Sequence, residues 1–95
     1  MNKSDVIASV AEKTGLEKTK VEKCVNALIE TIQESVASGD PVQFVGFGTF
    51  ERRRREARTG RNPQTGEELQ IPASNVPAFK AGKLFKDLVN AIHGN

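Results

Sequence analysis

The hydrophobic pattern of the chain changes period abruptly at the turn residues Ser38-Gly39-Asp40-Pro41. Before this point apolar side chains recur every three or four residues, which is the spacing of an amphipathic helix. After it, Val42 and Phe44 alternate with Gln43, which is the spacing of a half-buried strand. A chain of 95 residues with helices gathered before its strands is predicted to have an α+β fold.

The first helix is expected from about residue 3 to residue 13. Asn2 and Asp5 have the spacing of a capping box, in which side chains accept free N–H groups at the helix start. Gly15 follows the apolar run and can adopt the left-handed conformation that closes a helix. Both ends of this helix therefore carry a local signal.

The second helix is expected from about residue 18 to residue 38, with an apolar stripe along one side. No preferred capping residue marks its start, because Glu17 occupies the position before it. Cys24 falls on the stripe and is interpreted as a core residue, since a free cysteine usually behaves as a small hydrophobe. A helix-turn-helix reader is disfavoured, because the strongest basic cluster lies elsewhere in the chain.

The second half of the chain predicts strands and a long hairpin. Two strands are expected to meet at a tight corner made by Gly46-Phe47-Gly48. The turn residues Asn62-Pro63-Gln64-Thr65-Gly66 then lie in the middle of a hydrophilic stretch, so a projecting arm is expected at about residues 53–74. The chain returns to a strand at residues 76–79 and closes with a short helix at residues 83–92.

The arm carries most of the positive charge. The formal net charge is only +2, yet residues 52–61 contain six arginines and one acid, Glu56. Guanidinium groups crowded on one ribbon repel each other unless a polyanion lies alongside, and their planar fork suits phosphate. We expect a nucleic-acid partner. The alternative, a disordered charged loop, is opposed by the turn residues and the return strand.

Two further features leave both a functional and a structural interpretation open. Pro63 at the arm's tip is either an apolar wedge that enters a base-pair step or a proline that only shapes the turn. Lys80, Lys83 and Lys86 are spaced to lie near one another at the start of the last helix. They form either a phosphate-binding patch or an ordinary solvated helix face.

Several function classes find no support in the residues. The one histidine, His93, lies in the tail, and the sequence contains no acid pair and no metal-ligand spacing. An enzyme is therefore not expected. We expect no cofactor, metal, small-molecule substrate or membrane. The single cysteine excludes a disulfide within one chain, and no apolar run has the length of a signal peptide or a membrane span. A cytoplasmic setting is expected.

A second copy of the chain is the expected partner of its apolar surface. A chain this short buries a small fraction of its surface, so a monomer is expected to be marginal. Four of the five phenylalanines lie after Val45, beside stretches too polar to cover them. These rings are therefore expected to be buried against a partner subunit.

Three strings together resemble the bacterial histone-like HU proteins: VGFGTF at residues 45–50, ARTGRNPQTGEE at 57–68 and PAFKAGKLFKDLV at 77–89. The resemblance covers nearly the whole chain and implies one HU-like DNA-binding domain over residues 1–95. It implies an intertwined homodimer with a two-helix dimerisation base at residues 1–40, an antiparallel sheet saddle at 41–80 and a C-terminal helix at 81–95.

The resemblance also implies roles for individual residues. Pro63 is expected to insert between base pairs in the minor groove, and the aromatic rings of the shared dimer core are expected to be Phe47, Phe50 and Phe79. The remaining DNA-binding residues that it implies are Lys3, Arg53, Arg55, Arg58, Arg61, Asn62, Gln64, Lys80, Lys83 and Lys86.

This chain departs from the usual HU pattern in its arm and at one helix start. Arg52 and Arg54 stand where relatives commonly carry an apolar residue and an acid, so the arm is expected to be more cationic than usual. Glu56 replaces a small residue and is expected to pair with Arg54 or Arg58. Glu17 stands where Ser or Thr often caps, which costs on the order of 1 kcal/mol.

The resulting prediction is a nucleoid-associated protein that bends and compacts duplex DNA with little sequence specificity. One alternative is a sequence-specific bender like integration host factor, whose specificity comes largely from DNA deformability. Another is an interaction module whose basic arm binds an acidic protein or a membrane surface. RNA stays open as a partner, because phosphate contacts alone do not distinguish duplex types.

Overall fold

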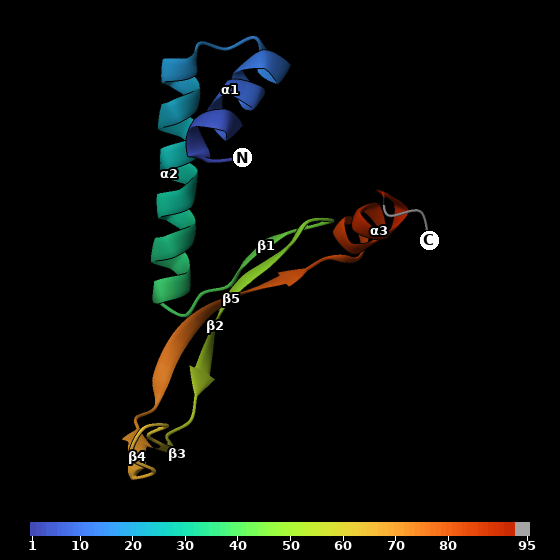
Figure 1. Ribbon diagram of the computed structural model, residues 1–95. Helices are drawn as coiled ribbons and strands as arrows, with labels where there is room; N and C mark the ends of the chain where they lie inside the picture. The colour runs from blue at the N-terminus through green and yellow to red at the C-terminus, as the bar shows by residue number, and fades with distance from the viewer. Residues whose placement is uncertain (93–95) are drawn as a thin grey trace. The chain divides into compact units, whose positions relative to one another are not determined.

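The computed structural model describes residues 1–92, and His93 lies outside the described residues (Figure 1). The elements follow in the order α1 (Lys3–Thr14), α2 (Lys18–Ala37), β1 (Val42–Phe44), β2 (Gly48–Arg55), β3 (Arg58–Arg61), β4 (Glu68–Ile71), β5 (Ser74–Ala81) and α3 (Lys83–Ile92). The predicted α+β architecture, with two helices, a sheet with a hairpin and a short last helix, is confirmed. The chain forms two compact units, one of residues 1–34 and one that begins at Ser35.

Local signals account for both ends of α1. The backbone N–H of Asp5 donates to Asn2 Oδ1 at 3.0 Å, and the backbone N–H of Asn2 donates to Asp5 Oδ2 at 3.0 Å. Gly15 has φ 74° and donates its N–H to the carbonyl of Ala11 at 2.9 Å. The predicted capping box and the left-handed glycine are both present.

The first unit has a small core between α1 and α2. Ile7, Ala11 and Val21 are buried, and Val10 and Val25 pack against them. The first helix has 12 residues and the second has 20, so α1 is too short to cover the whole apolar stripe of α2.

The interpretation of Cys24 as a core residue is wrong for the single chain, because its side chain is exposed. Val21 and Val25 pack with α1 on either side of Cys24 in the sequence, so Cys24 lies at the edge of the stripe and its side chain stays outside this contact. Further along the same helix, Leu28 and Ile29 are 50% and 41% exposed. Much of the apolar stripe is therefore open to a partner.

The sheet has three antiparallel strands in the order β1-β2-β5, and β3 pairs only with β4. In β2 and β5, Gly48 lies opposite Ala81 and Arg55 lies opposite Ser74. The two ladders are separated at residues 56–57 and 72–73, where Pro72 has no N–H to donate to a ladder. The expected arm therefore consists of the outer ends of β2 and β5 followed by the β3-β4 hairpin (Figure 1).

The glycine corner between β1 and β2 is also as predicted. The N–H of Phe47 donates to the carbonyl of Phe44 at 3.0 Å, which closes a tight turn, and Gly46 has φ 85°. A positive φ at the third residue of such a turn favours glycine, because other residues pay a steric cost there.

The expected core rings contact one another but are not covered by their own chain. Ring centroids of Phe50 and Phe79 lie 4.7 Å apart, and those of Phe47 and Phe79 lie 5.1 Å apart. Phe47 and Phe79 remain 45% and 39% exposed. In α3, Leu84 and Leu88 are 64% and 63% exposed. A single chain leaves this apolar cluster open.

No helix in residues 1–92 is long and apolar enough to cross a membrane. Within the same residues, no group of three or more His, Cys, Asp or Glu side chains is placed to hold a metal ion.

We predict that Glu17→Asp raises the free energy of unfolding by about 0.5–1 kcal/mol, because Asp is a preferred N-cap and keeps the charge. The carbonyl of Glu17 already accepts the N–H groups of Lys20 and Val21 at 3.1 and 3.0 Å, which places this residue at the cap position. Denaturant unfolding at one fixed protein concentration measures the change. Glu22→Asp, inside α2, is the control, and equal stabilities of Glu17→Asp and the unsubstituted protein would refute the assignment.

Candidate nucleic-acid interface

The arm exposes six arginine side chains along two consecutive strands. Four stand in a row at the outer end of β2, and two stand on β3. All six are exposed, namely Arg52, Arg53, Arg54, Arg55, Arg58 and Arg61. Because side chains alternate along a strand, Arg53 and Arg55 share one face of β2 while Arg52 and Arg54 share the other.

Arg52 bonds to the end of α2 and so has a structural role. Its Nη1 donates to the carbonyl of Ala37, the last residue of that helix, at 3.1 Å. The last carbonyls of a helix have no partner within the helix and carry partial negative charge, which a guanidinium satisfies. Sequence reasoning missed this contact, because no local signal links residues 15 positions apart.

Two acids pair with the next arginines of the row. Arg53 Nε lies 2.9 Å from Glu51 Oε2, and Arg54 Nε lies 3.1 Å from Glu56 Oε1. The expected pairing of Glu56 with an arginine is confirmed, with Arg54 as the partner. Arg55 and Arg58 make no side-chain hydrogen bond or ion pair within residues 1–92.

The tip of the arm is ordered by its own hydrogen bonds. Asn62 donates its N–H to the carbonyl of Glu67 at 2.9 Å and accepts, at its carbonyl, the N–H of Gly66 at 2.8 Å. Asn62 Oδ1 accepts the N–H of Gln64 at 2.8 Å. Asn62 therefore shapes the turn to which the sequence analysis assigned it. Pro63 lies between the two residues that this side chain links, at the tip of the arm.

Arg61 supports the tip from the last position of β3. Its Nη1 donates to the carbonyl of Gly66 at 3.1 Å, and Gly66 has φ 74°. One guanidinium nitrogen is thus used within the turn, while the side chain stays exposed. Arg61 is therefore placed both to brace the turn that carries Pro63 and to present charge beside it.

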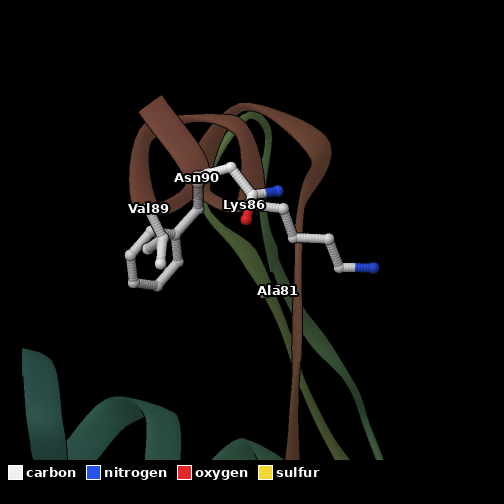
Figure 2. A pocket seen from close by; sticks show the side chains of 5 residues that line it. Ala81, Lys86, Val89 and Asn90 are labelled. Carbon is white, nitrogen blue, oxygen red and sulfur yellow. The ribbon is translucent and has the colours of Figure 1, made fainter. Parts of the chain in front are cut away.

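The lysine patch is exposed around the junction of β5 and α3. Lys83 Nζ lies 2.7 Å from Asp87 Oδ2, whereas Lys80 and Lys86 have no ion pair within residues 1–92. Lys86 lines a shallow pocket with Ala81, Phe85, Val89 and Asn90, and its ammonium extends away from Val89 (Figure 2). Lys3, the first residue of α1, is also exposed and belongs to the other unit.

The chain matches, over residues 1–90, the model of a family described as bacterial DNA-binding protein. It belongs to this family. The chain is 57% identical to the DNA-binding protein HU of Geobacillus stearothermophilus, over 94% of this chain and 99% of the relative. It is 58% identical to that of Staphylococcus aureus (strain COL), with the same coverage of both chains. The resemblance of the three strings to HU proteins is confirmed, and this is a family of DNA-binding proteins, not of enzymes.

Solved structures of family members have the same fold. The HU protein in an Anabaena HU–DNA cocrystal structure superposes with a TM-score of 0.89 at 53% identity, over 94% of this chain and 97% of that one. HU from Thermotoga maritima superposes with a TM-score of 0.68 at 36% identity, over 94% and 98%.

We predict that Arg52→Gln lowers the free energy of unfolding by about 1 kcal/mol, because a carbonyl at the end of α2 is left without its partner. Arg55→Gln is the matched control on the same strand and should stay within about 0.5 kcal/mol of the unsubstituted protein. Denaturant unfolding of both variants at equal concentration measures this. Equal stability of the two variants would show that the bond from Arg52 contributes nothing.

Proposed function

We propose that the chain is a histone-like architectural protein that binds duplex DNA as a homodimer, with little dependence on sequence. The observation that carries this proposal is the ordered hairpin that presents exposed arginines along its length and Pro63 at its tip. Arginine contacts to phosphate position a protein on DNA without reading bases. The relatives named DNA-binding protein HU and the HU protein crystallised with DNA support the same function.

The uncovered apolar surface supports the homodimer. Phe47, Phe79, Leu84 and Leu88 are each more than one third exposed in the single chain, and they lie in one unit. Exposed apolar groups of this kind mark an interaction surface. We assign dimerisation mainly to residues 1–40 and to the Phe47-Phe50-Phe79 cluster. We assign DNA contact mainly to the sheet and arm of residues 41–80 and to the lysines at the start of α3.

The arm is suited to the minor groove. Minor-groove architectural proteins, of which HU is a standard example, push an apolar side chain into a base step and kink the duplex. Pro63 is the apolar residue at the tip, held in place by the Asn62 and Arg61 bonds. We therefore assign the wedge to Pro63 and its flanks to Asn62 and Gln64.

The remaining cationic side chains are proposed to bind DNA phosphates away from the tip of the arm. Arg53, Arg55, Arg58 and Arg61 line the arm and meet phosphates in the groove. Phosphates on the flanks of the bent duplex contact four lysines, namely Lys3, Lys80, Lys83 and Lys86. Lys83 gives up its ion pair with Asp87 for a phosphate. A protein of this kind compacts DNA, so we place it in the cytoplasm, associated with the nucleoid.

We predict that Pro63→Ala reduces DNA bending while leaving the salt dependence of binding almost unchanged, because the wedge carries no charge. Fluorescence transfer between the ends of a labelled duplex reports the bend, and a salt titration of the same complex reports the slope. Pro77→Ala, on β5, removes a proline away from the tip and serves as the control. An unaltered bend in Pro63→Ala would remove the wedge assignment.

We predict that Arg55→Gln and Arg58→Gln each flatten the slope of log K against log salt by about 0.9 for every phosphate that the variant no longer neutralises. These two side chains have no protein partner within residues 1–92, so their charge is free for phosphate. Equilibrium binding to a random-sequence duplex at several salt concentrations measures the slopes. Slopes equal to that of the unsubstituted protein would place these side chains away from the DNA.

Competition separates this proposal from its alternatives. Integration-host-factor-like specificity predicts that random-sequence duplex competes poorly against one defined site. A module for an acidic protein or a membrane surface predicts that duplex DNA fails to displace that partner. Duplex RNA, added to the same assay, tests whether the arm accepts a different groove shape.

A further inference from the structure

The four consecutive arginines of β2 are not equally available to DNA. Arg52 bonds to the carbonyl of Ala37 at 3.1 Å. Arg53 pairs with Glu51 of the same strand, and Arg54 pairs with Glu56, the residue that follows the strand. Arg55 has no partner within residues 1–92. Two of the four charges of the row are therefore paired with acids before any DNA is bound, and a third guanidinium is hydrogen-bonded to a helix carbonyl.

Both acid pairs are built by the geometry of the strand. Glu51 and Arg53 are two residues apart, and so are Arg54 and Glu56, so each pair shares one face of the ribbon. The carboxylate bonds to Nε in both pairs, which leaves the two Nη groups of each arginine able to donate elsewhere. A phosphate approaching these Nη groups comes close to the carboxylate as well.

We propose that Glu51 and Glu56 compete with DNA phosphate for Arg53 and Arg54, and so limit the affinity and the salt dependence of DNA binding from within the arm. This inference rests on the proposed DNA-binding function. An arginine that keeps its acid neutralises no phosphate. An arginine that turns to phosphate leaves a free carboxylate beside the polyanion, and either course reduces the net release of counterions.

The two pairs differ in strength. The side chain of Glu51 is 31% exposed, whereas that of Glu56 is 80% exposed, so the pair with Arg53 is less screened by solvent. Removal of the Glu51 charge is therefore expected to have the larger effect.

The test compares Glu51→Gln and Glu56→Gln with Glu68→Gln in the full-length dimer. Glu68 lies on β4 of the same hairpin and has no ion pair within residues 1–92, so its variant removes equal charge without freeing an arginine. Binding to a random-sequence duplex is measured over a range of salt concentrations. Denaturant unfolding confirms that each variant is folded.

We expect Glu51→Gln to raise affinity at low salt by about twofold to fivefold per arm, the range for an exposed ion pair, and Glu56→Gln by less. Each is expected to steepen the salt slope, by up to about 0.9 for each additional phosphate neutralised, and Glu68→Gln to change both quantities less. In an Arg53→Gln background, Glu51→Gln should have little of this effect, because the competing pair no longer exists.

Equal effects of Glu51→Gln, Glu56→Gln and Glu68→Gln in a protein that binds DNA would overturn this inference alone, since the acids would then act only through net charge. The same conclusion follows if the effect of Glu51→Gln survives in the Arg53→Gln background. An unsubstituted protein that fails to bind duplex DNA at any salt concentration would overturn the proposed function and the inference together.

Discussion

Antiparallel pairing of β2 with β5 runs from Gly48 opposite Ala81 to Arg55 opposite Ser74. Its inner end places Phe50 opposite Phe79 and so builds the aromatic cluster. A Cβ on Gly48 would lie only 2.5 Å from the Phe79 ring and 2.6 Å from the carbonyl of Lys80, so this approach requires glycine. The outer end of the same pair carries the arginines into solvent. The surfaces proposed for dimerisation and for DNA contact are thus the two ends of one ladder.

Features with a local cause were predictable from the sequence. The cap at Asn2, the left-handed Gly15 and the corner at Gly46 each depend on a few adjacent residues, and the structure has all three. The hairpin was predictable because the turn at residues 62–66 lies between two extended segments. The proposed DNA-binding role of the arm rests on the density of arginine and on the three strings that resemble HU.

Features that depend on tertiary contacts were not predictable in the same way. Cys24 is exposed because α1 packs on Val21 and Val25 and leaves the edge of the stripe uncovered, which a helical stripe alone does not reveal. The bond from Arg52 to Ala37 depends on how the chain turns between α2 and β1. The density of arginine alone does not show that Arg53 and Arg54 pair with acids or that Arg52 is hydrogen-bonded to the end of α2.

The central claim is that two such arms bind and bend duplex DNA through phosphate contacts and a wedge. Its most direct test is fluorescence transfer between the ends of a random-sequence duplex of a few tens of base pairs, titrated with the protein at several salt concentrations. The account predicts transfer that rises with protein and fades as salt increases. Binding without a rise in transfer would contradict bending, and the absence of binding would contradict the DNA-binding function itself.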